Sequence, residues 1–514
     1  MEFDRLVLTP PQMRTAELAA GAHGVSVSEL MDIAGEALGR AVLEAAHRLM
    51  KKNILFICGN GNNGGDGYVA ARLLQGSAAE ITVIQCGQPK TDLAKAAFAK
   101  LSPETEILTL EQVIADPSII DHAEIIVDCV FGIGFHGELD RNLQWLFLKC
   151  ALSESYCIAC DAPSGVNCMS GRISPGTFAA HETVTFHRPK LGMLISPAKE
   201  RCGEIKTVPI GIGDYVSEYT RVVINYADKE LVKTFLPYRV EDSHKGNFGR
   251  VVLCCGSSAY PGAAVISSRA ALRSGVGIVN LCTHERVIDA ALGSIPECTF
   301  TPVRCSYDGY MLSDAADDIL RACQRAGALV IGCGLGKTEQ TEKLVCDLIR
   351  RAPCPIVLDA DGINCLSAHI DVLKEKRTEI ILTPHPAELA RLCGTDTASV
   401  TQDMFGHACE IAEQYGVTVH SKSTQTLTVK DNICYLTDFG CSALAKGGSG
   451  DMLAGLIGGL IAQGLSSEKA CVLADYIMGR SARALCETLS ARGVLPIDII
   501  ERFPRTFFEL EQDL

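Results

Sequence analysis

Short apolar runs of strand length recur along the chain in two series, and this pattern constrains the fold more than any other feature of the sequence. The first series is NILFIC from Asn53, ITVIQC from Ile81, EIIVDCV from Glu124 and YCIACD from Tyr156. Helical or loop stretches separate the runs, which is typical of a largely parallel sheet covered on both faces. Ser26 and Glu29 form a capping-box pattern ahead of apolar residues at helical spacing, so a long amphipathic helix is expected before the first run.

The second series begins at Arg250 and contains RVVLCCG, ALVIGCG, PIVLDADG, EIILTPH and VTVHSK. It also contains an expected hairpin, TLTVK and ICYLT, turned by Asp431 and Asn432. The stretch between the two series is irregular, which places a domain boundary near residue 225. A chain of 514 residues is long enough for two domains. The predicted fold class is therefore α/β, with two three-layer αβα domains at 1–220 and 224–514.

Charge and cysteine content exclude several classes of protein. The 61 acidic and 47 basic side chains give a formal net charge of −14, so the protein repels polyanions and nucleic acid is not an expected partner. The start, MEFDRLVLTP, has acids where a signal peptide has its basic region, so the 24 cysteines indicate a reducing cytoplasm. Cys157 and Cys160 face opposite sides of their expected strand and are interpreted as core thiols. The longest nearly uncharged stretch, MLAGLIGGLIAQGL, is shorter than the roughly 18–20 residues of a membrane span, so no membrane contact is expected.

A glycine-rich loop, CGNGNNGGDG, follows the first apolar run. Gly59, Gly61 and Gly64 satisfy the Gly-x-Gly-x-x-Gly pattern, and backbone amides at the start of the following helix suit a phosphate. The second run, ITVIQCG, lacks the terminal acid of a dinucleotide-binding strand, which disfavours an NAD dehydrogenase. No Lys-Ser/Thr pair follows the glycines, which excludes a Walker loop. A glycine turn that serves only strand-to-helix packing is the alternative.

Polar side chains stand at the ends of three runs of the first series. They are Asn62, Asn63, Asp66, Asp128, Asp161 and Ser164. The carboxyl ends of parallel strands are where such folds bind ligands. Carboxylate, amide and hydroxyl oxygens suit a hard cation, and a remaining carboxylate can act as acid or base. The alternative is that each aspartate caps a helix or a turn.

The segments NNGGDG, VDCVFGIGFHGE and DAPSG, in this order, resemble the epimerase domain of the NAD(P)H-hydrate repair enzymes over roughly residues 5–215. The resemblance implies a Rossmann-like fold, interconversion of the R and S hydrates of NADH and NADPH, and potassium held by Asn63, Asp128 and Ser164. Asp161 is the implied acid/base residue. The implied substrate-binding residues are Asn62, Asn63, Gly64, Gly65, Asp66, Gly132, Ile133, Gly134, Phe135, His136, Gly137 and Glu138. A binding or scaffold domain without turnover is the alternative, against which the intact Asp161 argues.

The most informative segment of the second half is LAKGGSGDMLAG, residues 444–455. Its closely spaced backbone amides precede a helix that begins near Asp451, and together with the helix dipole they form an anion hole for phosphate oxygens. Asp451 beside this hole is placed to take a proton from a hydroxyl, although a favourable N-terminal charge on the helix is the alternative. His385, between two prolines in TPHPAEL, is either a site residue or a structural histidine.

This segment, together with PGAA, GCGLG, LDADG and TPHPAEL, resembles the ribokinase-like fold and, more closely, the nucleotide-dependent NAD(P)H-hydrate dehydratases over roughly residues 228–512. The resemblance implies a hydrate pocket lined by Ala264, Gly334, His385 and Asp451. The implied nucleotide-binding residues, for ADP or ATP with a magnesium ion, are Lys422, Ser423, Thr424, Gln425, Thr426, Gly447, Gly448, Ser449 and Gly450. The sequence departs from the family pattern at Ser423, Cys441 and Met478, where the family has Gly, Asn and His. A small-molecule kinase, such as a thiazole or hydroxymethylpyrimidine kinase, is the alternative, because the same glycine loop serves that chemistry.

The predicted function is the repair of hydrated NADH and NADPH in the cytoplasm. The first domain would epimerise the hydrates, and the second would dehydrate the S hydrate with ADP or ATP. The fusion is coherent because a stereospecific dehydratase would otherwise leave one epimer unrepaired. The expected partners are these small molecules and, as a homo-oligomer, further copies of the chain.

Overall fold

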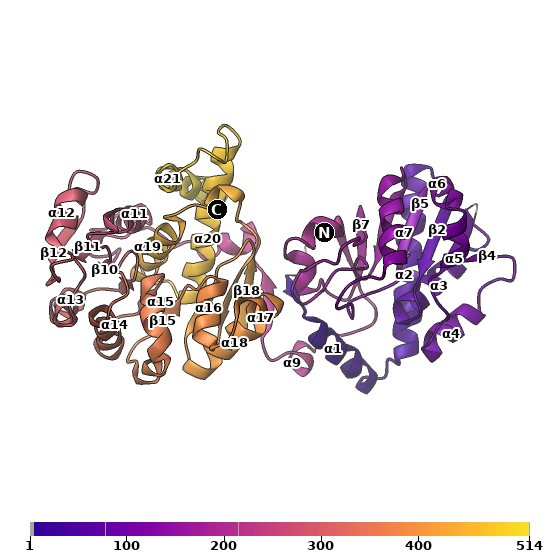
Figure 1. The fold of residues 1–514 in the computed structure, drawn as a ribbon, viewed down its shortest axis with the longest axis horizontal. Coiled ribbons are helices and arrows are strands. Elements are labelled where there is room, and N and C mark those ends of the chain that lie inside the picture. Colours follow the sequence, from indigo (N-terminus) through magenta and orange to yellow (C-terminus); the bar gives the residue numbers. More distant parts are fainter. Residues whose placement is uncertain (1–4, 78, 214, 513–514) are drawn as a thin grey trace. The chain divides into compact units, whose positions relative to one another are not determined.

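The computed structural model of the protein describes residues 5–77, 79–213 and 215–512 (Figure 1). The chain divides into two compact units, Met1–Val223 and Ile224–Leu514. The stretch between the two predicted series is less irregular than expected, because it contains α9 (Val216–Tyr219), β9 (Val223–Tyr226) and α10 (Lys229–Lys233). Within the described ranges, no helix combines the length and the apolar character needed to cross a bilayer.

The first unit contains a seven-stranded parallel sheet in the order β4-β3-β2-β5-β6-β7-β8. Its strands are β2 (Asn53–Cys58), β3 (Glu80–Gln85), β4 (Glu106–Thr109), β5 (Ile125–Cys129), β6 (Tyr156–Cys160), β7 (Glu182–Phe186) and β8 (Glu204–Val208). The four runs of the first predicted series are β2, β3, β5 and β6. The sequence analysis did not identify β4, β7 and β8, because polar residues interrupt their apolar patterns. In β7 these polar residues are buried, which only the neighbouring strands explain.

Helices cover both faces of this sheet. They are α1 (Pro10–Ala22), α2 (Val27–Leu49), α3 (Asn62–Leu74), α4 (Asp92–Ala99), α5 (Leu110–Ala115), α6 (Ser118–His122), α7 (Arg141–Leu152) and α8 (Lys199–Cys202). The predicted long helix is α2, and Ser26 and Glu29 form its capping box as expected. Cys160 lies in the core cluster of α2 and α3, whereas Cys157 lies in the cluster of α7 on the other face. The two cysteines are therefore core thiols on opposite faces, as predicted.

The second unit is built on a mixed sheet, in which the order β18-β17-β16-β15-β14-β13-β10-β11-β12 is found. The strands are β10 (Arg250–Cys254), β11 (Ile278–Thr283), β12 (Thr299–Pro302), β13 (Ala328–Ile331), β14 (Ile356–Leu358), β15 (Ile380–Leu382), β16 (Thr418–Ser421), β17 (Thr426–Lys430) and β18 (Ile433–Thr437). The predicted hairpin is confirmed as β17 and β18, with Asp431 at a φ of 51° in the turn. Strands β11 and β12 were not identified from the sequence. The predicted α/β class is confirmed in both units.

A buried helix organises the second unit. The helices include α11 (Pro261–Arg273), α12 (Glu285–Ala291), α13 (Ala316–Cys323), α14 (Glu339–Arg351), α15 (Asp361–Leu366), α16 (Pro386–Cys393), α17 (Thr397–Gln402), α18 (Met404–Tyr415), α19 (Ser449–Ala462), α20 (Ser467–Cys486) and α21 (Pro496–Gln512). The long apolar stretch of the sequence forms α19, which is buried from Met452 to its end. A Cβ at Gly455 would lie only 2.0 Å from the carbonyl oxygen of Ser267, so α19 packs directly on the backbone of α11. This close packing fixes the N-terminus of α19, where Asp451 lies.

Candidate active sites

A cavity of about 400 Å³ lies at the carboxyl edge of the first sheet. The lining includes the predicted residues Asn62, Asn63, Asp66, Gly132, Ile133, Gly134, Phe135 and Asp161. Arg14 and Glu17 of α1 line it as well, and the sequence analysis did not identify either. His136, Gly137 and Glu138 are exposed and lie outside the lining.

Two of the predicted glycines serve backbone packing in this structure. A Cβ at Gly64 would lie 2.1 Å from the carbonyl oxygen of Gly59, and one at Gly65 would lie 2.8 Å from the Cε of Met31. Neither glycine lines the cavity. The tight turn from β2 into α3 therefore depends on Gly64, and the close packing of α3 on α2 depends on Gly65. Asn62, Asn63 and Asp66 supply the polar atoms of the wall.

Asp161 forms a buried ion pair with Lys190. Its Oδ1 accepts hydrogen bonds from Lys190 Nζ at 2.5 Å, from Thr185 Oγ1 at 3.2 Å and from the backbone amide of Phe186 at 3.2 Å. Asp161 has a φ of 62°, a strained conformation of the kind found at functional sites. Lys190 is fully buried and also donates to Thr185 Oγ1 and the carbonyl oxygen of Phe186. Lys190 was not among the predicted site residues, although a lysine between the apolar segments TVTF and LGML was an available signal.

Two further carboxyl groups share this cavity. Burial, with added repulsion from Asp161 and Glu17, raises the pKa of Asp66 well above its usual range. Burial also raises the pKa of Glu17, and repulsion from Asp161 raises it further. The positive charges of Lys190 and Arg14 lower this pKa but do not cancel the shift. The cavity therefore places the Asp161–Lys190 ion pair beside Asp66, a carboxyl whose pKa is raised, and a carboxyl of raised pKa is suited to acid/base work.

Asp128 and Ser164 form a buried polar pair at the ends of β5 and β6. Asp128 Oδ2 accepts from the backbone amide of Ser164 at 2.7 Å, and Oδ1 accepts from the Ser164 hydroxyl at 2.7 Å and the amide of Val130 at 3.1 Å. Burial raises the pKa of Asp128 to about 6 against the effect of these hydrogen bonds. No lysine or arginine of the described residues pairs with it. Asn63 has a buried side-chain nitrogen without a hydrogen-bond partner in the described chain, which can donate to a bound substrate, while its Oδ1 is the atom that a cation would use.

These three residues fit a monovalent cation. A buried carboxylate without a positive partner is unfavourable, and a bound cation would neutralise it. The carboxylate, hydroxyl and amide of Asp128, Ser164 and Asn63 provide oxygen ligands, which hard cations prefer.

Two cavities meet at the start of α19 in the second unit. The larger, about 630 Å³, is lined by the predicted nucleotide residues Lys422, Ser423, Thr424, Thr426, Ser449 and Gly450, and by His385. The smaller, about 360 Å³, is lined by Gly334 and Asp451. Because Gly450 lines one cavity and Asp451 the other, the first turn of α19 separates them. Ser423, Cys441 and Met478, the three departures from the family pattern, all line the larger cavity.

The remaining predicted residues of this unit line neither cavity. Ala264 is fully buried, while its neighbour Ala263 lines the smaller cavity. Gln425 is buried and donates to Asp438 Oδ1 at 2.7 Å. Gly447 and Gly448 lie outside the lining of both cavities, and Gly448 has a φ of 96° at the N-cap of α19.

His385 has a structural role as the N-cap of α16. Its Nδ1 accepts from the backbone amide of Ala387 at 3.1 Å, and its own amide donates to Glu388 Oε2 at 2.9 Å. Burial and the nearby charge of Lys422 lower the pKa of His385. The side chain is 48% exposed and lines the larger cavity, not the smaller one that Gly334 and Asp451 line.

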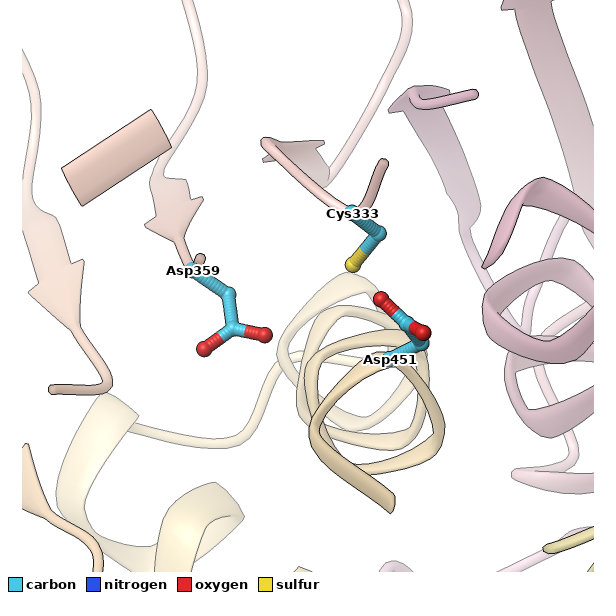
Figure 2. Close-up of side chains that lie close together, drawn as sticks. All are labelled: Cys333, Asp359 and Asp451. Carbon is cyan, nitrogen blue, oxygen red and sulfur yellow. The ribbon is translucent and has the colours of Figure 1, made fainter. Parts of the chain in front are cut away.

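Asp451 lies beside Cys333 and Asp359 (Figure 2). One ligand atom of each residue lies within 4.8 Å of the other two. Burial and then repulsion from Asp359 raise the pKa of Asp451 to about 6, while a hydrogen bond from the Cys333 thiol opposes this shift. Asp451 is thus a carboxyl poised to exchange a proton near neutral pH. Cys333 and Asp359 stand in the segments GCGLG and LDADG, but neither was among the predicted site residues.

Asp359 links this cluster to the larger cavity. Its Oδ1 accepts from Thr383 Oγ1 at 2.7 Å and is also hydrogen-bonded to Lys422 Nζ. Burial would lower the pKa of Lys422, but the carboxylates of Asp359 and Glu388 raise it above its usual value. Lys422 therefore stays a cation beside the amides of Ser449 and Gly450.

Family models match both halves of the chain. Residues 27–192 match the model described as the YjeF-related protein N-terminus, and residues 251–505 match the model described as NAD(P)H-hydrate dehydratase. Together the two matches cover the strands that carry the sites described above.

Full-length relatives combine the two halves in one protein. A bifunctional NAD(P)H-hydrate repair enzyme of Coxiella burnetii is 33% identical over 495 residues, which are 95% of this chain and 96% of that protein. A protein of the same name from Escherichia coli is 29% identical over 95% of this chain and 91% of its own length. A Bacillus subtilis ADP/ATP-dependent NAD(P)H-hydrate dehydratase, co-crystallised with ATP and Mg²⁺, is 31% identical, with a TM-score of 0.49 over 55% of this chain and 98% of its own.

Proposed function

Because the chain belongs to the family of bifunctional NAD(P)H-hydrate repair enzymes, in which an epimerase is joined to a dehydratase, we propose how its two sites divide that work. The first domain interconverts the R and S hydrates at the cavity of Asp161. The second converts the S hydrate to NADH or NADPH with ADP or ATP. The observation that carries the second assignment is the position of Asp451 on the turn of α19 between two cavities, beside the amides of Ser449 and Gly450.

In the second domain the smaller cavity holds the hydrated nicotinamide ring and the larger one the nucleotide. Asp451, with a pKa of about 6, is ionised at neutral pH and accepts the proton of the ring hydroxyl as that oxygen attacks the terminal phosphorus. The amides at the start of α19 and the ammonium of Lys422 stabilise the charge on the transferred group. The ring nitrogen then expels phosphate from the adjacent carbon, and loss of a proton from the next ring carbon restores the dihydronicotinamide.

The magnesium ion expected with the nucleotide is assigned to no residue of this chain. Magnesium usually keeps several waters and binds substrate phosphates, so the nucleotide itself supplies most of its ligands. The bound ion would neutralise phosphate charge during transfer.

In the first domain the hydrates interconvert by loss and return of the ring hydroxyl. Asp66, whose pKa is raised well above its usual range, donates a proton to the leaving hydroxyl. The carboxylate of Asp161, held by Lys190, stabilises the planar cation that remains and accepts a proton from the water that adds to its other face. A potassium ion held by Asn63, Asp128 and Ser164 would offset the negative charge of these acids and of the substrate phosphates.

The test is chromatography of a mixture of R and S hydrates incubated with the purified full-length protein, with and without ADP or ATP. Loss of both epimers with nucleotide, and equilibration of a single epimer without it, are expected. A stable phosphorylated product would instead identify a small-molecule kinase. Dehydration of the S epimer alone, with no interconversion, would identify the first domain as a binding domain without turnover.

The cellular context is part of the proposal. All 24 cysteines are free thiols, which fits a reducing cytoplasm. Association into a homo-oligomer stays a prediction, which light scattering coupled to size-exclusion chromatography tests.

A further inference from the structure

A buried carboxylate lies in the wall of the larger cavity of the second domain and has no role in the mechanism above. It belongs to Asp475 of α20, one helical turn before Met478, and this residue is 8% exposed. Among the described residues that line this cavity, Asp475 is the only acid. Neither lysine of the lining pairs with Asp475. Lys422 pairs with Asp359, and Lys446 Nζ donates to the carbonyl oxygens of Arg492 and Val494.

One buried hydroxyl is hydrogen-bonded to this carboxylate, and a buried imidazole lies against it without forming a hydrogen bond to it. Thr437 Oγ1 of β18 donates to Asp475 Oδ2 at 2.7 Å. His420 Nε2 of β16 lies 3.3 Å from Asp475 Oδ1, and His420 is fully buried, with Nδ1 2.9 Å from Thr428 Oγ1. Each oxygen of an ionised carboxylate can accept two hydrogen bonds, so Asp475 keeps acceptor capacity toward the cavity. Thr437 therefore orients the carboxylate, and the imidazole of His420 packs beside it.

A carboxylate such as Asp475 repels the phosphates of a nucleotide, which are stabilised by cations and N–H donors. For those phosphates the same lining offers the amides of Ser449 and Gly450 and the ammonium of Lys422. A buried carboxylate facing a polyanion is unfavourable unless donors of the ligand meet it. In a nucleotide, pairs of adjacent donors occur only in the nucleoside. They are the two hydroxyls of the ribose, or the N1–H and the amino group of guanine; adenine instead presents an amino group next to an acceptor nitrogen.

We propose that Asp475, oriented by Thr437, is the nucleoside-recognition residue of the second domain and accepts hydrogen bonds from a pair of adjacent donors on the nucleotide. This inference rests on the proposed nucleotide-dependent function of the same cavity. It makes Asp475 a determinant of nucleotide specificity, separate from the phosphate-binding turn of α19 and from the base Asp451.

The experiment is calorimetric titration of the full-length protein and its Asp475→Asn variant with ATP, GTP and their 2′,3′-dideoxy forms, together with dehydration kinetics. Asn is nearly isosteric and keeps an acceptor for Thr437. Loss of a hydrogen bond to a charged acceptor should weaken the Kd of the recognised nucleotide about 10- to 100-fold. Turnover at saturating nucleotide should stay near that of the parent. Glu487→Gln removes the same charge from an exposed position of the same helix end and should leave every Kd unchanged.

Comparing the four nucleotides shows whether the donor pair belongs to the ribose or to guanine. If the ribose is recognised, the Asp475→Asn effect appears with ATP and vanishes with dideoxy-ATP. If guanine is recognised, the parent prefers GTP to ATP with or without the hydroxyls, and the variant loses that preference. Both results support the proposal.

Other results overturn it. Removing a negative charge near phosphates by itself strengthens binding, so an Asp475→Asn variant that binds all four nucleotides as tightly as the parent, or more tightly, rejects the role. The parent alone gives a second measurement that needs no folded variant: equal Kd values for all four nucleotides also reject it. If the parent binds none of them, the nucleotide-dependent function fails along with the inference, whereas a parent that binds and an unaffected variant refute the inference alone.

Discussion

The carboxylate of Asp128 accepts two hydrogen bonds from Ser164, one from its backbone amide and one from its hydroxyl, both at 2.7 Å. The pair joins the ends of two neighbouring parallel strands, and its negative charge has no basic partner among the described residues. Asn63, at the start of α3, would add its Oδ1 as a third oxygen. This arrangement suits a cation, and the first prediction tests whether one is bound.

Asp128→Ala should weaken epimerisation and abolish its response to potassium, because it removes the charged ligand. Dehydration of pure S hydrate should be unchanged, since the second domain has its own ligands. In the parent, replacing sodium with potassium should raise the melting temperature of the first domain through preferential binding to the folded state. If neither epimerisation nor the melting temperature of the parent responds to potassium, these residues only cap turns and do not bind a cation.

Asp451→Asn should lower the dehydration turnover about 10²–10⁴-fold, the usual scale for a positioned acid or base. Nucleotide affinity should be retained, because the amides of Ser449 and Gly450 and the Lys422 ammonium are untouched. Steady-state kinetics with calorimetry of nucleotide binding checks both parts, with epimerisation as the internal control. Near-normal dehydration by the variant would reject Asp451 as the base.

The dehydration rate should fall below about pH 6, because Asp451 must be deprotonated to act as a base and its pKa is raised to about 6. The Cys333 thiol donates a hydrogen bond that favours the ionised form, so Cys333→Ala should raise this pKa and move the acid limb of the pH–rate profile to higher pH. Cys333→Ser, which keeps a donor, should move the limb less. A limb near pH 4, the range of an unperturbed aspartate, would contradict the assignment.

Lys190→Met should destabilise the first domain by about 3–5 kcal/mol, because it leaves the buried carboxylate of Asp161 without its partner. Denaturant unfolding monitored by tryptophan fluorescence suits this measurement, since the one tryptophan, Trp145, is in α7 of the first domain. Adding Asp161→Asn to Lys190→Met should recover part of the loss, whereas strictly additive effects would show that the pair is not coupled.

Fragments 1–220 and 224–514 should each fold and keep their own activity, because each unit has its own core clusters. Circular dichroism and the two separate assays check this. Insoluble or inactive fragments from cuts at several neighbouring positions would show that each half needs the other.

Much of this protein can be predicted from patterns that are local in the chain. The apolar runs of β2, β5, β10 and β13, the capping box of α2 and the turn at Asp431 depend on residues within a few positions of one another. The strands missed in the prediction, such as β7, bury polar residues whose environment is supplied by distant segments. The sites also contain features that are local in the chain, namely the glycine loops that start α3 and α19.

Pairings between distant residues depended on the tertiary structure. Lys190 and Asp161 are 29 positions apart, and only the packing of the segment after β7 against the end of β6 brings them together. Glu17 reaches the first cavity from α1, and His420 of β16 lies against Asp475 of α20. The sequence by itself determined the two α/β domains and the glycine-rich helix starts that can hold phosphates, because backbone geometry and apolar periodicity are written locally. Tertiary structure alone decided which carboxyls are buried, which are paired and which of two cavities each one lines, because the energy of a charge depends on everything packed around it.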